Sequence, residues 1–567
     1  MKKLVVVGGV AGGASAAARA RRLDASAEIV MFERGKHVSF SNCCLPYCLS
    51  GIIADSDSLV LMTPEKFRIT HNIDARVNSE VVAIKRAEKK VVVKNLITKE
   101  EYEESYDKLI LAPGANPVLL KSISGIHSAN VFTVRNVTDI QALKARVEQK
   151  DINHIVVVGG GFIGIEVAEN LRKDGKDVSV IEAMDQIMAP FDYDMVQILH
   201  KEMDDNGVKL YLSSSVTAIE DDRVKAVKNG KEFSVLADVV IMAVGVSPET
   251  KLAVDAGLEI GETRGIKVNH NYQTSDPDIY AVGDAIEVYD ALMHCCGRLA
   301  LAGPAQRQAR AVADHIYGIN NNNKGYIGSF CIRIFEQNAA STGLNEKLAA
   351  KGGYKYDSVT IYAPDKVGLM PNSHYMVFKL VFEVPTGRII GAQAIGKGDV
   401  DKRIDVIASM ITMHATLEDL KELELCYSPV FSTAKDVVNL AAMVSLNILY
   451  NRYRQVHVAE VRGLVESGAF IVDVREENEY KNGHLNGAHN IPLSQLRTRM
   501  KEIPNDIPVY VHCRSSQRSY YALCCLQGNG YTNIINISGS FLGISLYEYF
   551  NDKTENRKPI MNHYNFN

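Results

Sequence analysis

The chain has 567 residues, which is too long for one hydrophobic core and predicts several domains. Hydrophobic residues make up 46% and charged residues 23%, as in ordinary globular proteins, and a net charge of -4 excludes the basic surface field that favours nucleic-acid binding. The ten cysteines have no framework spacing and no apolar run is long enough for a membrane span, so we expect a cytoplasmic protein with neither nucleic acid nor membrane as a partner.

The chain begins with the pattern of a dinucleotide-binding βαβ unit. Residues 3–7 and 27–32 are predicted strands, and residues 14–23 a helix rich in small side chains. Glu33 ends the second strand where an acidic residue accepts hydrogen bonds from ribose hydroxyls. This pattern explains the apolar start better than a signal peptide does. The residues expected to contact the nucleotide are Gly8, Gly9, Val10, Ala11, Gly12, Gly13, Glu33 and Arg34.

A stretch with two adjacent cysteines follows this unit, and it reads VSFSNCCLPY over residues 38–47. Its distance from the glycine turn places the thiol of Cys43 over the reactive part of a bound nucleotide, which makes Cys43 the predicted nucleophile. Four residues separate Cys43 from Cys48, so an internal disulfide between them is an open alternative. Pro46 predicts that a helix begins in this stretch rather than continues through it.

The same βαβ pattern returns over residues 155–182. Residues 155–158 and 178–181 are predicted strands, and the helix between them runs to Leu171. Glu182 ends the second strand, and no Arg or Lys occurs in the four residues after it. A carboxylate there suits a free ribose 2′-hydroxyl and repels a 2′-phosphate, so this unit is predicted to prefer NADH over NADPH. The turn residues expected at the nucleotide are Gly159, Gly161, Phe162 and Gly164.

Two shorter segments complete the nucleotide-binding pattern. Residues 109–112 form a predicted strand that breaks into a turn at Ala112, Pro113 and Gly114. Residues 274–284 form a strand that ends at Gly283 and Asp284, where the carboxylate is placed to hold a polyol hydroxyl of a flavin. A helix over residues 305–317 is predicted to follow.

These four motifs occur in the order found in the pyridine nucleotide-disulfide oxidoreductase family, which the chain resembles over roughly residues 1–450. The resemblance implies an enzyme with FAD as the first nucleotide and NADH as the second. Phe162 would cover the flavin until NADH displaces it. The domains implied are an FAD domain over residues 1–150 and 274–327, an NAD domain over residues 151–273 and an α+β dimerisation domain over residues 328–450, which includes a hairpin of residues 377–382 and 388–395.

Within that family, the stretch around Cys43 resembles the single-cysteine branch of coenzyme A-disulfide reductases, NADH oxidases, NADH peroxidases and persulfide reductases. In the family, the partner subunit of a homodimer completes each active site, and residues 425–436 match the segment that does so. The resemblance therefore brings Tyr427 to the substrate sulfur, and Cys426 beside it is expected to be a small buried residue. The residues expected to bind coenzyme A, as substrate or bound ligand, are Arg22, Ser39, Asn42, Arg307 and Lys435.

Departures from the family pattern leave the specificity for coenzyme A disulfide open. His71 stands where these relatives offer Lys, and Cys44 stands where they have Gly. The second subunit-derived aromatic residue, expected near residues 368–371, is absent. A metal role for Cys295 and Cys296 is not predicted, because no second ligand pair accompanies them.

The pattern changes to a new small α/β unit over residues 455–555. Residues 470–475 and 509–512 are predicted strands, and the second runs into Cys513 at the start of a helix, where backbone N–H groups lower the pKa of a thiol. This unit resembles a rhodanese domain, in which four residues between the cysteine and Arg518 are typical of sulfurtransferases, and His484 is expected to be structural. The loop residues expected to hold a sulfur substrate on Cys513 are Arg514, Ser515, Ser516, Gln517 and Arg518.

Together, the motifs predict an α/β enzyme in which NADH reduces the flavin and the flavin reduces a sulfur bond formed by Cys43. The predicted substrates are coenzyme A persulfide, polysulfide or coenzyme A disulfide, and Cys513 would carry sulfane sulfur. Three alternatives stay open: an NADH oxidase or peroxidase that uses a Cys43 sulfenic acid, a disulfide reductase with a Cys43–Cys48 pair, and a thiol redox sensor. The attached rhodanese unit disfavours the first, because oxygen chemistry needs no persulfide carrier.

Overall fold

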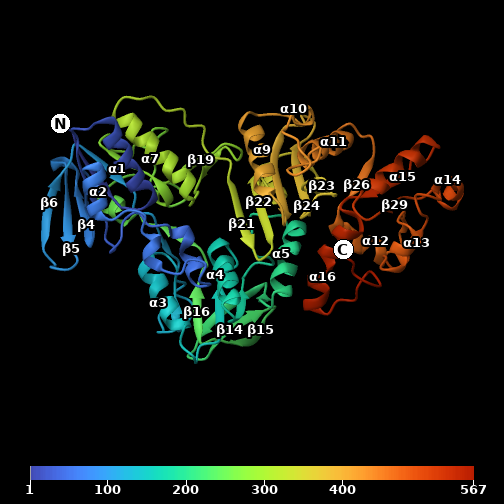
Figure 1. The fold of residues 1–567 in the computed structure, drawn as a ribbon, viewed down its shortest axis with the longest axis horizontal. Coiled ribbons are helices and arrows are strands. Elements are labelled where there is room, and N and C mark those ends of the chain that lie inside the picture. The colour runs from blue at the N-terminus through green and yellow to red at the C-terminus, as the bar shows by residue number, and fades with distance from the viewer. Residues whose placement is uncertain (1, 567) are drawn as a thin grey trace. The chain divides into compact units, whose positions relative to one another are not determined.

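The computed structural model describes residues 2–566, which form two compact units. Unit 1 comprises Tyr211–Tyr326 and the residues up to Asp185, and unit 2 comprises Gln186–Leu210 and the residues from Ile327 onward. Figure 1 labels the helices and strands of both units. In the described part of the chain, no helix combines the length and apolarity that crossing a bilayer demands.

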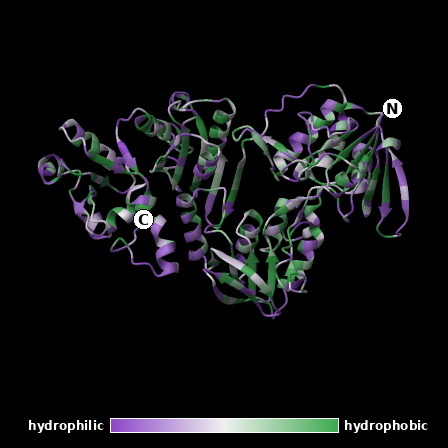
Figure 2. Cartoon of the chain, turned by 180° about the vertical axis from the view of Figure 1, so that it is seen from behind, coloured by the Kyte–Doolittle hydropathy of each residue, from purple (hydrophilic) through white to green (hydrophobic). Residues whose placement is uncertain are grey.

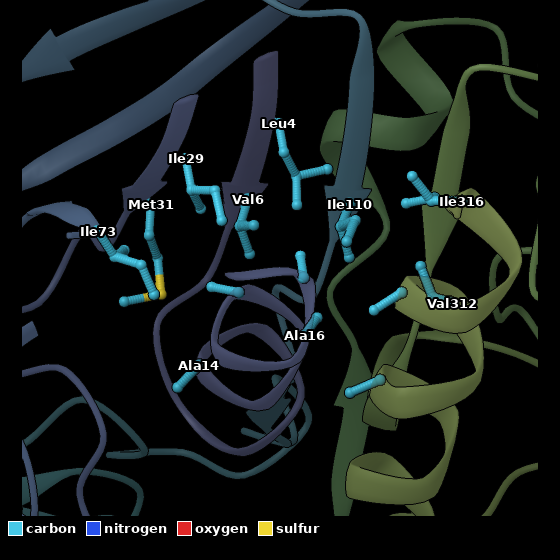
Figure 3. Close-up of a cluster of buried hydrophobic side chains, with 14 of the residues drawn as sticks. Leu4, Val6, Ala14, Ala16, Ile29, Met31, Ile73, Ile110, Val312 and Ile316 are labelled. Atoms are coloured by element: carbon cyan, nitrogen blue, oxygen red, sulfur yellow. The ribbon is translucent and has the colours of Figure 1, made fainter. Parts of the chain in front are cut away.

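Unit 1 contains a parallel sheet in the strand order β18-β7-β1-β2-β3. Helix α1 (Ala11–Leu23) and helix α7 (Ala302–Ile316) pack against each other, and a close-up shows side chains of both beside the apolar residues of the sheet (Figure 3). The strands are β1 (Lys3–Val7), β2 (Glu28–Phe32), β3 (Asp74–Arg76), β7 (Lys108–Leu111) and β18 (Ile279–Ala281).

Helix α1 begins earlier than the predicted residue 14, because the glycine turn itself continues into the helix. A side chain at Gly13 would place its Cβ 1.8 Å from the carbonyl oxygen of Gly8, so only glycine allows the first turn to pack this tightly. The same construction occurs in the second nucleotide unit, where a Cβ at Gly164 would lie 2.1 Å from the carbonyl oxygen of Gly159. The two predicted βαβ units therefore have the same close backbone packing at their glycine turns.

The second parallel sheet of unit 1 places β11, β10, β16 and β9 side by side. Helix α4 (Phe162–Lys173) follows β10 and starts at the turn that was predicted to hold a nucleotide. The strands are β9 (Val131–Phe132), β10 (His154–Val158), β11 (Asp177–Ile181) and β16 (Val239–Met242).

Unit 2 contains an antiparallel sheet in the order β21-β22-β25-β24-β23. The predicted hairpin is confirmed, since β24 (Tyr375–Glu383) pairs antiparallel with β25 (Ile389–Gly396). Both strands are buried almost throughout, and Figure 2 shows hydrophobic residues concentrated in the strands. The other elements of this region are β21 (Ser329–Ile334), β22 (Gln337–Gly343), α8 (Glu346–Lys351), β23 (Tyr356–Pro364), α9 (Val400–Thr412), α10 (Leu417–Glu422) and α11 (Val437–Leu449).

The C-terminal part of unit 2 is a parallel sheet in the order β26-β30-β29-β27-β28. Its last helix, α16 (Ser540–Glu555), packs against α5 (Tyr193–Asp205), where the His200 and Phe550 rings lie 4.9 Å apart. The other elements are β26 (Arg454–Val456), α12 (Val458–Glu466), β27 (Phe470–Asp473), α13 (Glu477–Lys481), β28 (His489–Asn490), α14 (Leu496–Arg499), the 3₁₀ helix η5 (Met500–Glu502), β29 (Val509–His512), α15 (Gln517–Gly528) and β30 (Ile534–Ile537). The molecule thus has the mixed α/β architecture that the sequence predicts.

Candidate active site

The acidic residues at the ends of β2 and β11 hold the two glycine turns. The backbone N–H of Gly9 donates to Glu33 Oε2 at 2.9 Å, and the N–H of Gly160 donates to Glu182 Oε2 at 2.6 Å. The second oxygen of each carboxylate accepts from the backbone two residues further on. Because a carboxylate offers about four acceptor positions, each acid retains capacity for a ribose hydroxyl. The sequence did not reveal this second, structural role.

The predicted FAD contacts converge at the carboxyl ends of parallel strands, where doubly wound sheets bind ligands. A Cβ at Gly8 would lie 2.1 Å from the carbonyl oxygen of Ala112, so the turn after β7 touches the first glycine turn. The backbone N–H of Gly283, after β18, donates to Gln308 of α7 at 2.7 Å. Burial raises the pKa of the neighbouring Asp284 carboxyl, and Arg135 partly opposes this change. These backbone-lined turns fit a dinucleotide with a flavin.

The cysteine stretch lies against the first glycine turn. The backbone N–H of Ser39 donates to the carbonyl oxygen of Gly9 at 2.7 Å, and Ser39 has a φ of 47°, which is uncommon for a residue with a side chain. A 3₁₀ helix, η1 (Asn42–Cys48), follows. As predicted, a helix begins within this stretch, at Asn42, but it also continues past Pro46 to Cys48, so the proline does not interrupt it.

The cysteines of η1 have different environments. Cys43 is exposed and Cys44 is partly buried, whereas Cys48 is fully buried. Burial raises the pKa of the Cys48 thiol. Of these thiols, Cys43 is therefore the most accessible to a dissolved substrate.

Helix α4 brings a carboxylate to this stretch that sequence reasoning missed. The hydroxyl of Tyr47 lies 3.5 Å from Glu166 Oε1, and Ser50 donates to Asn170 Oδ1 at 2.6 Å. Burial, reinforced by the charge of Glu169, raises the pKa of Glu166 to about 7. Glu166 and Asn170 are four positions apart in the predicted helix, and this shared face was the signal that could have identified them.

The charge of Glu166 acts on the predicted nucleophile. Desolvation raises the pKa of the Cys43 thiol, and the negative charge of Glu166 is the largest electrostatic contribution in the same direction. Because Glu166 titrates near pH 7, its effect on the thiol weakens as the solution becomes more acidic. The site thus couples the protonation of a carboxyl group to that of the thiol.

The residues predicted to bind coenzyme A come from several elements. In unit 1, Ser39 and Asn42 flank Cys43, while Arg22 and Arg307 are exposed on α1 and α7. The neighbouring Arg19 is engaged, since its guanidinium lies 2.5 Å from Asp314. The remaining predicted residue, Lys435, is exposed in unit 2.

The segment of unit 2 that carries Tyr427 is exposed. Tyr427 is 52% exposed and Phe431 is 73% exposed. Cys426 is also exposed, so the expectation that it is a small buried residue is wrong: the segment lies outside any helix or strand and presents these side chains to solvent. This apolar surface lies just before α11.

Cys513 directly follows β29 and begins a tightly organised loop. Its side chain is buried, and the first backbone N–H groups of α16, at Phe541 and Leu542, donate to the carbonyl oxygens of Cys513 and Arg514 at 3.0 and 3.1 Å. Burial lowers the pKa of the Arg514 guanidinium. The loop ends at Ser516, which has a φ of 73°, and α15 begins at the next residue.

The last two predicted loop residues are engaged within the protein. Arg518 forms a two-pronged ion pair with Glu479, with N–O distances of 2.6 and 2.7 Å. Gln517 donates to the hydroxyl of Tyr521 at 3.0 Å. Ser515 is partly buried in the loop. Arg518 is thus paired with the Glu479 carboxylate. Its role in holding sulfur on Cys513 stays a prediction.

A buried ion pair between Arg475 and Asp473 forms at the end of β27, the strand that pairs with β29. The Arg475 guanidinium lies 2.6 Å from Asp473 Oδ2 and donates to the carbonyl oxygen of Gly483 at 2.7 Å. His484 stacks on Tyr480 with ring centroids 3.9 Å apart, and its Nδ1 lies 2.8 Å from the Tyr480 carbonyl oxygen. These contacts agree with the structural role predicted for His484.

One group of acidic residues in the described chain has metal-like spacing, but a lysine lies in its centre. Asp192, Asp194 and Glu346 surround the ammonium of Lys379 at 3.2, 2.9 and 3.0 Å. Lys379 is fully buried, and the three carboxylates raise its pKa against the opposing effect of burial. The cluster is therefore an ion-paired structural contact within unit 2.

Three family models match the chain. The pyridine nucleotide-disulphide oxidoreductase model matches residues 2–359, its dimerisation domain residues 332–437, and the rhodanese-like domain residues 457–546. A coenzyme A disulfide reductase of Staphylococcus haemolyticus is 33% identical over 441 residues, which cover 78% of this chain and 98% of the relative.

Two solved structures share nearly the whole architecture, and a third shares most of it. The reduced CoADR-RHD of Bacillus anthracis has a TM-score of 0.92 and 43% identity, with 96% of this chain and 98% of that chain covered. An NAD-dependent persulfide reductase from A. fulgidus has a TM-score of 0.90 and 33% identity, with 95% and 99% covered. A water-forming NADH oxidase from Lactobacillus brevis has a TM-score of 0.75 and 27% identity, with 80% and 100% covered. The chain therefore belongs to the pyridine nucleotide-disulphide oxidoreductases, enzymes that use FAD and NAD(H), and carries their dimerisation domain together with a rhodanese-like domain.

Proposed function

We propose that this enzyme uses NADH to reduce coenzyme A persulfide, polysulfide or coenzyme A disulfide through Cys43, while Cys513 carries sulfane sulfur. The observation that carries the proposal is the presence in one chain of two separate cysteine sites. One is the exposed Cys43 beside the first glycine turn, and the other is Cys513 in a rhodanese-like loop. The names of two similar proteins, a coenzyme A disulfide reductase and a persulfide reductase, support both substrate classes.

The Cys43 thiolate attacks one sulfur of a coenzyme A disulfide, which forms a mixed disulfide and releases one coenzyme A thiolate with the electron pair of the broken S–S bond. With a persulfide, the same attack releases sulfide. When bound and reduced by NADH, FAD would supply the two electrons needed to cleave the mixed disulfide, which returns Cys43 to the thiolate and releases the second coenzyme A as a thiolate. Glu166, whose charge acts on the Cys43 thiol and whose pKa is about 7, would exchange the accompanying protons.

The residues proposed to hold each ligand follow from the turns described above. FAD is assigned to Gly8, Gly9, Val10, Ala11, Gly12, Gly13, Glu33, Arg34, Ala112, Pro113, Gly114, Gly283 and Asp284. NADH is assigned to Gly159, Gly161, Phe162, Gly164 and Glu182. Coenzyme A is assigned to Arg22, Ser39, Asn42, Arg307 and Lys435, and the Cys513 sulfur to Arg514, Ser515, Ser516, Gln517 and Arg518.

The dimerisation domain supports a homodimer in which Tyr427 of one subunit serves the Cys43 of the other. The exposure of Tyr427 and Phe431 is compatible with a surface that a second subunit covers. The cysteine pattern, with Cys43 and Cys426 both exposed, suits a reducing compartment such as the cytoplasm.

The opposite exposures of Cys43 and Cys48 disfavour the internal-disulfide alternative, because Cys48 is enclosed by the packing around η1. The NADH oxidase alternative has the support of the Lactobacillus brevis structure, at lower identity and without coverage of the full chain. Anaerobic assays distinguish these functions.

The decisive experiment follows NADH consumption without oxygen, using polysulfide, coenzyme A disulfide and hydrogen peroxide in turn. The proteins compared are the wild type, Cys43→Ser and Cys513→Ser. We expect both sulfur substrates to require Cys43, and Cys513 to be required only for some sulfur donors. Fast peroxide turnover with no activity toward either sulfur substrate would instead establish the oxidase or peroxidase function.

A further inference from the structure

A serine hydroxyl from another part of the rhodanese-like domain reaches the Cys513 sulfur. Ser540 is the first residue of α16, and its side chain is completely buried. Its Oγ accepts a hydrogen bond from the backbone N–H of Cys513 at 3.2 Å and lies 3.9 Å from Cys513 Sγ. The sulfur distance is within reach of an O–H···S contact, so Ser540 touches the atom that reacts.

The backbone conformation of Ser540 is costly for a serine. Its φ is 50°, and the preceding Gly539 has a φ of 78°. Glycine adopts this left-handed region freely, whereas a residue with a Cβ incurs strain there. Strained residues of this kind cluster at functional sites. Serine supplies a hydroxyl group at this position, which glycine would lack.

The single proton of the Ser540 hydroxyl has three acceptors within reach. Besides the sulfur, these are Ser516 Oγ at 3.1 Å and the carbonyl oxygen of Ile537 at 3.3 Å. Ser516 can itself donate to that carbonyl, at 3.2 Å. Because Ser516 can satisfy Ile537, the Ser540 proton is available to the sulfur. A bond to a thiolate is charge-assisted and about twice as strong as one to a neutral acceptor.

We propose that Ser540 is a catalytic residue of the sulfur-transfer site, whose hydroxyl donates to the Cys513 thiolate and keeps it in the reactive ionised form. This inference rests on the proposed role of Cys513 as a sulfur carrier. Ser516 assists, because its hydroxyl can donate to the Ile537 carbonyl oxygen when the Ser540 hydroxyl turns to the sulfur. Ser540, Ser516 and the Ile537 carbonyl oxygen thus form one hydrogen-bond network beside the Cys513 sulfur.

With a hydropolysulfide as donor, the thiolate forms an S–S bond to the terminal sulfur. The adjacent S–S bond breaks, and the shortened polysulfide leaves with its electron pair as an anion. Cys513 becomes a persulfide, and no external oxidant or reductant is consumed. Ser540 contributes by increasing the fraction of Cys513 that is ionised before the attack.

The test is the Ser540→Gly variant of the full chain, since glycine suits a φ of 50° and the variant relieves the strain. Alkylation of Cys513 by iodoacetamide is followed across a pH series by mass spectrometry of the Cys513 peptide. Loss of one charge-assisted bond shifts the thiol–thiolate equilibrium about tenfold toward the thiol. The freed thiolate is more nucleophilic by about threefold, so the variant should react about threefold more slowly at the acidic end of the series, where the thiol predominates, and about threefold faster at the alkaline end, where the thiolate predominates.

Ser545→Ala is the matched control, because Ser545 is also fully buried in α16 but its hydroxyl contacts Met561 instead of Cys513. We expect the control to follow the wild-type profile. A Ser540→Gly profile that superimposes on the wild type, or one that is slower by the same factor at every pH, would overturn the inference, because neither shows the crossover that a change in ionisation produces.

A parallel measurement separates this inference from the proposed function. Wild-type protein is incubated with polysulfide, and the Cys513 peptide is examined for one added sulfur atom. Absence of that sulfur refutes the carrier role, whereas the alkylation crossover still reports on Ser540. Added sulfur in the wild type, at a reduced rate in Ser540→Gly at the acidic end of the pH series, supports both.

Discussion

At the scale of single residues, the environment of Cys43 determines when its thiol ionises. A nucleophilic cysteine must be a thiolate, yet desolvation and the charge of Glu166 both raise the pKa of Cys43. Glu166 has a pKa of about 7, so near neutrality it exists in both protonation states. A proton arriving at Glu166 therefore makes the loss of the thiol proton easier, which suits a site that exchanges protons during sulfur reduction.

Replacing Glu166 with Gln should make Cys43 more reactive in mildly alkaline solution. The variant removes the negative charge that opposes ionisation, so the pKa of Cys43 falls and alkylation above pH 7 becomes several-fold faster. The difference should shrink below pH 7, because the wild-type carboxyl is then protonated as well.

Iodoacetamide labelling of the Cys43 peptide between pH 6 and pH 9 measures this effect. Glu148→Gln, an exposed carboxylate at the end of the neighbouring helix α3 (Val137–Val147), is the control and should leave the profile unchanged. Equal labelling rates of Glu166→Gln and the wild type above pH 7 would contradict the electrostatic role.

At the scale of elements, the loop after β29 depends on the buried ion pair below it. Asp473 ends β27, and its carboxylate receives three hydrogen bonds from the side chain of Arg475. The guanidinium also lies 4.0 Å from the centre of the Phe541 ring, at the start of α16. Burial lowers the pKa of the adjacent His512, which favours its neutral form. The pair thus links β27, α16 and the strand that leads to Cys513.

Asp473→Asn should destabilise the rhodanese-like part of unit 2 by about 3–5 kcal/mol, because the buried guanidinium loses its counter-charge. Hydrogen exchange of the β27 and β29 amides in the full chain measures the local free energy of opening. Glu502→Gln, which breaks an exposed pair with Arg499, serves as the comparison and should change little. Unchanged exchange in Asp473→Asn would show that the pair is dispensable.

At the scale of the whole molecule, unit 2 combines segments that are far apart in the chain. Asp192 and Asp194 belong to Gln186–Leu210, whereas Lys379 and Glu346 come from the sheet region after Ile327. Carboxylates from both segments raise the pKa of Lys379, so the stability that this contact provides is complete below the unfolded value of 10.5 and is lost only as pH rises through the folded value. Lys379 is therefore charged throughout the neutral range.

Lys379→Met should lower the stability of unit 2 by about 3–5 kcal/mol at neutral pH, since three carboxylates are left without their cation. Mutual repulsion makes these carboxylates bind protons more tightly in the folded than in the unfolded state. By linkage, the variant then regains stability as pH falls from 7 to 5.

Thermal unfolding at several pH values tests this expectation. The gap between the midpoints of the wild type and Lys379→Met should narrow in mild acid. Lys421→Met, which removes a partly exposed lysine that pairs with Glu418, should leave the midpoint unchanged at each pH. A gap that stays constant between pH 7 and pH 5 would contradict the repulsion argument.

The sequence by itself determined the two glycine turns, the strands that lead into them, the β24–β25 hairpin and the loop of Cys513. Each of these is a local pattern, in which apolar periodicity or the freedom of glycine dictates the backbone within a few residues. It also determined the family and its cofactors, because several such patterns occur in one order.

Only the tertiary structure decided which thiols are accessible and which groups surround them. The exposure of Cys43 and Cys426, the burial of Cys48, the approach of Glu166 to Cys43 and that of Ser540 to Cys513 all depend on elements distant in sequence. Burial and electrostatic interactions are set by how those elements pack in space. A linear pattern does not contain that information, and for this reason the residues that tune both cysteines were absent from the sequence-based prediction.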